Sequence, residues 1–201
     1  MVVDGWLDAL FPAACAGCRT PGAALCAACR PAPSAVRRAH AGSLTVYAAG
    51  PYAGGLRRAI LAFKRGRRDC GAALGALFGE RLAARVPAGS VLVPVPTVAA
   101  RRRERAFDQS VVLANALGLA SGAPVLAVLR QIAGDAQRGR SRAARLRARG
   151  RFACTAPSLV AGTRIVLVDD VMTTGATLRD CAAALECCGT RVTEACVVAL
   201  A

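Results

Sequence analysis

Short apolar runs alternate with amphipathic stretches along most of the chain. Apolar runs at 91–96, 165–168 and 195–200 are typical of buried strands. Helical spacing of apolar residues at 56–63, 74–82, 111–119 and 178–188 predicts helices between them. A run at 44–47 predicts a strand or hairpin that turns through Gly50 and Pro51. Helices alternating with strands predict an α/β fold with a parallel sheet.

The first 35 residues follow a different pattern. Trp6, Leu7, Leu10 and Phe11 are spaced as on a short helix that stops at Pro12. Two Cys-x-x-Cys pairs follow, Cys15 with Cys18 and Cys26 with Cys29. Four thiolates in this spacing favour a tetrahedral structural zinc site over a disulfide framework or a direct nucleic-acid contact. We therefore expect a zinc ribbon at 1–35 and one larger domain at 36–201.

Two acids directly follow the 165–168 run, which is predicted to end there. Because ligands bind at the carboxyl ends of strands in open α/β sheets, Asp169 and Asp170 are candidate site residues. Two adjacent carboxylates suit a sugar diol or a hard metal ion. The alternative is a buried strand whose acids only cap the next helix.

Hydroxyls and a glycine come next, in Thr173, Thr174, Gly175, Ala176 and Thr177. Backbone N–H groups in such a loop, at the start of a helix, can hold a phosphate. The acids and the loop together resemble the 13-residue signature of type I phosphoribosyltransferases, which implies phosphoribosyl pyrophosphate (PRPP) as ligand. The acids would then bind ribose hydroxyls and the loop would bind the 5′-phosphate.

A second candidate loop follows the 91–96 strand. If this strand lies beside the 165–168 strand, its exit loop faces the same crevice. Pro96, Thr97 and Arg103 are then candidate ligands of the pyrophosphate.

Charge favours anionic partners. The formal net charge is +15, and the segment 130–151 is the most basic part of the chain, which predicts a mobile loop that closes on an anionic substrate or lies along nucleic acid. Lys64 lies in Phe63-Lys64-Arg65-Gly66, so a P-loop nucleoside triphosphatase is excluded. The apolar runs are too short to span a bilayer and the first residues are acidic, so we expect a cytoplasmic protein without membrane insertion.

Nearly the whole chain resembles the ComF family, competence-associated proteins with a zinc ribbon and a phosphoribosyltransferase-like domain. The resemblance rests on the four cysteines, Phe63-Lys64, Val93-Pro94-Val95-Pro96, Arg103-x-Arg105-Ala-Phe-Asp-Gln109 and 168–177. It implies the type I phosphoribosyltransferase fold, Mg²⁺ with PRPP, and a link to DNA uptake. In the flexible loop Arg130, Gln137 and Arg145 are the expected contacts, whereas Gly134, Arg140 and Ala148 depart from the family pattern.

Two functions are compatible with these residues. One is transfer of phosphoribosyl from PRPP to an unknown acceptor. The other is a non-catalytic single-stranded DNA-binding or nucleotide-sensing protein that uses the same fold, although aromatic residues for base stacking are only 4% of the chain.

Overall fold

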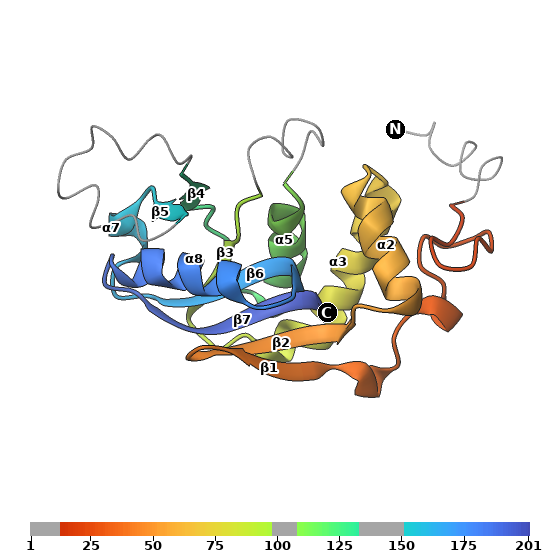
Figure 1. Cartoon of the computed structure of the whole chain (residues 1–201), viewed down its shortest axis with the longest axis horizontal. Coiled ribbons are helices and arrows are strands. Elements are labelled where there is room, and N and C mark those ends of the chain that lie inside the picture. Colours follow the sequence, from red (N-terminus) through yellow and green to blue (C-terminus); the bar gives the residue numbers. More distant parts are fainter. Residues whose placement is uncertain (1–12, 98–107, 133–150) are drawn as a thin grey trace.

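A five-stranded sheet forms the centre of the computed structural model, which describes residues 13–97, 108–132 and 151–201 (Figure 1). The strand order is β1-β2-β7-β6-β3. The strands are β1 (Arg37–Ala41), β2 (Leu44–Pro51), β7 (Arg191–Leu200), β6 (Arg164–Met172) and β3 (Ser90–Pro94). All neighbouring pairs are parallel except β1 with β2. The predicted α/β fold with a mostly parallel sheet is confirmed.

The β1–β2 hairpin turns earlier than the sequence predicts. The turn includes Gly42, whose φ of 66° lies in the left-handed region that glycine adopts without strain. Gly50 and Pro51 instead continue β2 and pair with Ala199 and Leu200 of β7. The predicted turn through Gly50 and Pro51 is wrong because pairing with the neighbouring strand keeps both residues extended.

Three helices cover one face of the sheet. They are α2 (Gly54–Lys64), α3 (Arg68–Leu82) and α5 (Gln109–Ser121), and a short 3₁₀ turn η3 (Ala83–Arg85) follows α3. Phe78 and Leu113 are fully buried among them, together with Val166 and Val168 from β6. These helices and one face of the sheet therefore share one buried core.

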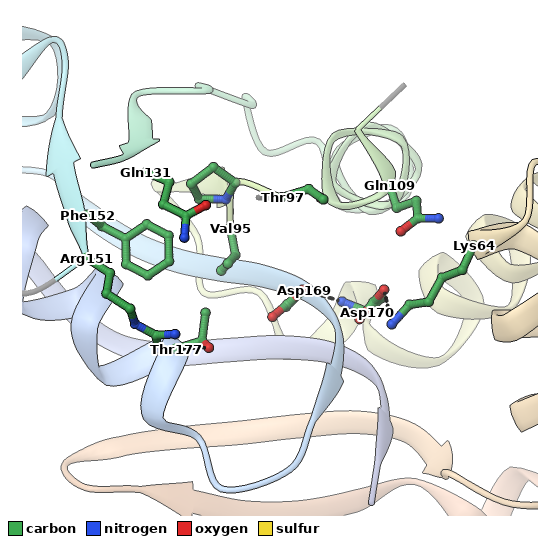
Figure 2. Close-up of a pocket in the computed structure, with 11 residues that line it drawn as sticks. Lys64, Val95, Thr97, Gln109, Gln131, Arg151, Phe152, Asp169, Asp170 and Thr177 are labelled. Carbon is green, nitrogen blue, oxygen red and sulfur yellow. Dashed lines mark hydrogen bonds and ion pairs between the residues drawn. The ribbon is translucent and has the colours of Figure 1, made fainter. Parts of the chain in front are cut away.

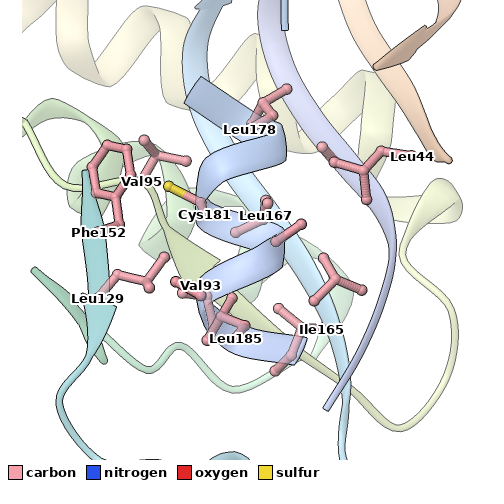
Figure 3. Packing of buried hydrophobic residues seen from close by; sticks show 14 of the residues in the cluster. Leu44, Val93, Val95, Leu129, Phe152, Ile165, Leu167, Leu178, Cys181 and Leu185 are labelled. Atoms are coloured by element: carbon pink, nitrogen blue, oxygen red, sulfur yellow. The ribbon is translucent and has the colours of Figure 1, made fainter. Parts of the chain in front are cut away.

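The other face is covered by α8 (Ala176–Glu186), by α7 (Pro157–Val160) and by a separate two-stranded sheet, β4 (Leu129–Gln131) with β5 (Phe152–Cys154). Ile165 and Leu167 of β6 face this layer and pack against Cys181 and Leu185 of α8 (Figure 3). Because successive strand residues point to opposite faces, β6 contributes to both cores and is apolar at every position from Ile165 to Val168.

The cysteine-rich segment packs beside α2 (Figure 1). It contains two 3₁₀ turns, η1 (Ala27–Cys29) and η2 (Pro33–Ala35). Ala24 and Leu25 are buried in the same cluster as α2 and α3. Gly55 of α2 lies so close that an added Cβ would stand 2.5 Å from the Cys29 carbonyl oxygen. The predicted helix at 6–11 lies outside the described residues.

His40 lies in β1 with its side chain exposed. Outside the ribbon, Cys187 is exposed, whereas Cys70, Cys154, Cys181 and Cys196 are buried. In the part of the chain that the structure describes, no helix combines the length and apolarity needed to cross a membrane.

Candidate functional site

The end of β6 creates the site, because β6 is longer than its neighbour β3. The last β3 pair joins Pro94 to Val168, and the Val95 N–H then donates to the Val168 carbonyl at 2.8 Å. β6 continues alone on this side to Met172. The prediction that the strand ends before the acids is therefore wrong. Asp169 and Asp170 are strand residues, and they point to opposite faces of the sheet.

A pocket of about 150 Å³ extends around this strand end and includes both acids (Figure 2). Its lining comes from strand ends, helix ends and the small β4–β5 sheet. The residues are Lys64, Val95, Pro96, Thr97, Gln109, Gln131, Arg151, Phe152, Asp169, Asp170 and Thr177. The structure thus brings both predicted acids, Pro96, Thr97 and Thr177 into one cavity.

On the α2 side of β6, Asp170 pairs with a lysine. Lys64, the last residue of α2, places its Nζ 2.7 Å from Asp170 Oδ2. The two side chains are 27% and 15% exposed. The sequence marks Lys64 as part of the Phe63-Lys64 motif of the resemblance, but nothing local indicates that α2 ends opposite β6.

On the α8 side, Asp169 points toward Phe152 and Thr177 (Figure 2). Its Oδ1 accepts the Asp170 N–H at 2.8 Å. Burial, and then the negative charge of Asp170, raise the pKa of Asp169 to about 8. The folded protein therefore binds the Asp169 proton more tightly than an exposed aspartate does.

The predicted phosphate loop leads directly into α8. Gly175 has φ 72°, and an added Cβ there would stand 2.5 Å from Ala41 Cβ. Thr174 Oγ1 accepts the Ala176 N–H at 3.4 Å. Thr173 and Thr174 are exposed at the rim, and Thr177 faces the pocket. A glycine is needed here for both the backbone angle and the space.

Arg151 places a cation beside this loop. Its Nη2 donates to Thr177 Oγ1 at 3.4 Å and its Nε to Asp180 Oδ2 at 3.0 Å. The sequence places Arg151 only among many arginines of the 130–151 segment. The two ends of that segment are anchored in the fold. Arg130 lies exposed in β4 opposite Ala153, while Gln137 and Arg145 lie outside the described residues.

The β3 exit loop is held by an acid that sequence reasoning did not single out. Asp108 accepts the Thr97 N–H at 3.4 Å and the Thr97 hydroxyl at 3.1 Å. The Ser110 hydroxyl also donates to Asp108, at 2.7 Å. Asp108 therefore fixes Thr97 at the pocket mouth. Arg103 lies outside the described residues.

Gln109, Gln131 and Phe152 also line the pocket, and of the three only Gln109 belongs to a motif noted in the sequence. Gln131 and Phe152 pair across β4 and β5, so the small sheet presents an amide and an aromatic ring above Asp169. Only the spacing of Gln131 and Phe152 from other predicted strands could have indicated this arrangement. The sequence between the two residues carries no strand pattern.

The four cysteines of the ribbon meet at one point. The Sγ atoms of Cys15, Cys18, Cys26 and Cys29 all lie within 4.8 Å of one another, and those of Cys18 and Cys26 are 3.6 Å apart. A tetrahedral zinc–thiolate site with Zn–S bonds of about 2.3 Å has sulfur–sulfur edges of about 3.8 Å. The group therefore fits a metal such as zinc.

Backbone amides prepare Cys15 for metal binding. The Gly17 and Cys26 N–H groups donate to its Sγ at 3.3 and 3.4 Å. Burial acts to raise the pKa of the Cys15 thiol, but backbone donors outweigh it and lower the pKa to about 6. The thiolate, which is the form that binds metals, is thus favoured at neutral pH.

The fold and the pocket define an α/β protein with a polar, charged site at the carboxyl end of a parallel sheet. The chain belongs to the phosphoribosyl transferase domain family, whose model matches residues 70–201. Lys64 and the cysteine cluster lie outside the matched residues. A solved structure, TT1426 from Thermus thermophilus, is similar at 21% identity and a TM-score of 0.38, over 66% of this chain and 73% of that chain. Comparison with curated proteins gives no match.

Proposed function

We propose that the protein binds PRPP at the end of β6 and transfers its phosphoribosyl group to an acceptor nitrogen. One observation carries this proposal. Two adjacent carboxylates, Thr177 from the Thr-Thr-Gly-Ala-Thr loop and Thr97 from the neighbouring strand exit line one pocket in a phosphoribosyl transferase domain. Diol, phosphate and pyrophosphate each have a chemically suited group there.

Asp169 and Asp170 take the ribose hydroxyls in this proposal. With a pKa near 8, Asp169 can donate a hydrogen bond to a ribose oxygen when protonated and accept one when ionised. Thr173 to Thr177 hold the 5′-phosphate with backbone N–H groups and hydroxyls. Arg151, fixed on Thr177 and Asp180, adds positive charge at that end.

Pro96 and Thr97, with Arg103, face the pyrophosphate, and Lys64 lies within reach of the same anionic ligand. During transfer the bond from the anomeric carbon to the pyrophosphate oxygen breaks and a bond to the acceptor nitrogen forms. The carboxylates stabilise positive charge that develops on the ribose.

The oxygen-rich donor set suits a hard cation, with Asp169 and Asp170 as its protein ligands or as ligands of its waters. Mg²⁺ bound with PRPP supplies charge that stabilises the departing pyrophosphate. The protein's own groups orient the ribose and phosphates around it.

A finer assignment rests on the chain's resemblance to the ComF family. The four-cysteine group beside α2 supports it, because it adds a metal-binding ribbon to the phosphoribosyl transferase domain. The proposal then includes a role linked to DNA uptake in the cytoplasm. The acceptor is to be identified by experiment.

Calorimetric titration of PRPP with Mg²⁺ into the full chain, followed by pyrophosphate detection with nucleobases and single-stranded DNA added, tests this function. Binding with acceptor-dependent release of pyrophosphate is expected. Binding without release favours the alternative, a nucleotide-sensing or DNA-handling protein. Absence of binding contradicts the site itself.

The matched variant is Asp169→Asn with Asp170→Asn, which removes both carboxylates at nearly constant volume. We expect PRPP affinity to fall by more than about 100-fold, because two charge-assisted contacts are lost. Far-UV circular dichroism should remain unchanged. Wild-type affinity in the double variant would remove the acids from the site.

A further inference from the structure

A second, larger cavity lies between the cysteine ribbon and α2. Its volume is about 290 Å³. The lining consists of Ala14, Cys15, Ala16, Arg19, Arg58, Leu61, Ala62, Arg65 and Arg67. None of these residues lines the pocket at the end of β6, so the two cavities are separate. We call it the arginine groove.

Four arginines from three chain segments surround this groove. Arg19 comes from the ribbon, Arg58 from the middle of α2, and Arg65 and Arg67 from the turn after α2. Arg67 is held in place by Asp69 and by the Ala14 carbonyl oxygen at 2.8 Å. Within the described parts of the chain, Arg19, Arg58 and Arg65 form no ion pair. The groove therefore carries concentrated positive charge that one carboxylate only partly neutralises.

The backbone at Arg19 is unusual. Its φ of 68° makes it the one non-glycine residue with positive φ among the described residues. Side chains disfavour this region, where glycine is the usual residue. The Arg19 N–H donates to the Cys15 carbonyl at 2.8 Å, so the turn of the first cysteine pair imposes this angle. A guanidinium thus stands at the groove on a position fixed by the metal-binding turn.

Alanines and Leu61 form the apolar part of the groove lining. Arg19, Arg58 and Arg65 are exposed, so their attraction for an anion is screened by water and depends on several of them binding it together. Guanidinium forks recognise phosphate oxygens in pairs, and four of them can contact more than one phosphate group.

We propose that the arginine groove is a second anion site, which binds a small pyrophosphate-type ligand between the ribbon and α2. The ribbon then has a role beyond its own folding, because it supplies Arg19 and closes one wall. Arg65 directly follows Lys64, so the second site lies one residue along the chain from the cation of the β6 pocket.

Titration of inorganic pyrophosphate into the zinc-loaded full chain, without added Mg²⁺, tests the proposal. The test variant is Arg58→Gln with Arg65→Gln. The control is Arg38→Gln with Arg191→Gln, which removes the same charge from exposed positions in β1 and β7. We expect at least tenfold weaker binding in the test variant and less than twofold change in the control.

Equal weakening in both variants would mean a diffuse charge effect and would overturn the proposal, as would unchanged affinity in the test variant. Binding of a single-stranded oligonucleotide, but not of pyrophosphate, through Arg58 and Arg65 would also overturn the small-anion site. PRPP binding with Mg²⁺, measured in parallel, should change less than twofold in the test variant. If neither the wild type nor any variant binds PRPP, the proposed function is contradicted. The pyrophosphate result still tests the arginine groove on its own.

Discussion

Asp169 and Asp170 are neighbours in β6, but they lie on opposite sides of the strand and have different surroundings. On the α2 side, Asp170 has a lysine 2.7 Å away. On the α8 side, Asp169 is enclosed, accepts a backbone N–H and has a pKa raised to about 8. Arg151, the cation on this side, pairs with Asp180.

One strand end can hold two acids in one small cavity because each acid has its own surroundings. Two ionised carboxylates this close repel each other, and this repulsion adds to burial in raising the pKa of Asp169. Because the two acids lie on opposite faces of β6, the residues on each face form the surroundings of one acid.

The largest expected effect comes from Cys15→Ser, which tests whether the stability of α2 depends on the ribbon. Loss of one of four sulfur ligands should weaken zinc binding by more than about 100-fold. Because Leu25 and Cys29 pack against α2, hydrogen exchange should accelerate in 13–36 and in α2 but not in α8. Mass spectrometry gives the zinc content. Cys187→Ser, at an exposed cysteine outside the cluster, should keep the metal.

Gly175→Ala should destabilise the protein at the start of α8. The new Cβ would meet Ala41 Cβ at 2.5 Å with φ at 72°, so we expect a loss of roughly 2–3 kcal/mol in unfolding free energy. Gly162→Ala is the matched control, since φ is also 72° there but nothing lies within 4 Å. Urea unfolding should show a clearly smaller loss in the control, of about 1 kcal/mol. Equal losses would mean that contact with β1 is unimportant.

Asp170→Asn should break the ion pair on the α2 side and leave Lys64 without its carboxylate. Because both side chains are mostly buried, we expect a loss of about 1–3 kcal/mol. The comparison variant is Asp180→Asn, which breaks the Arg151 pair on the other side. That pair is 53% and 36% exposed, so its loss should amount to about 0–1 kcal/mol. The opposite ranking would contradict the asymmetry.

Measured per pH unit, the smallest effect is the slope that Asp169 gives to the dependence of stability on pH. Its folded pKa, about 8, is above the usual 3.8, so the folded state binds the proton more tightly than the unfolded state. The contribution to stability is complete below pH 3.8 and is lost as pH rises toward 8 and beyond. Relative to Asp169→Asn, the wild type should lose up to about 1.4 kcal/mol per pH unit across this window. Parallel curves for the two proteins, from urea titrations at each pH, would show that Asp169 titrates normally.

Much of the fold was readable from local pattern. The apolar runs at 91–96, 165–168 and 195–200 became β3, β6 and β7, because double burial requires continuous apolar residues. Boundaries were less accurate. β6 extends through its acids to Met172, because pairing with β7 continues to Leu200 and a carboxylate at a strand end can still reach solvent.

By itself the sequence determined those parts of the protein whose chemistry lies within a few neighbouring residues. The four-cysteine group and the acids followed by the Thr-Thr-Gly-Ala-Thr loop are of this kind, since a turn or a strand–helix junction brings such residues together whatever surrounds them. Only the tertiary structure decided that Lys64 meets Asp170, that Arg151 meets Thr177 and that Arg19 joins α2 at a groove. Those contacts join separate elements, and their geometry depends on the order and register of the strands, which no local pattern encodes.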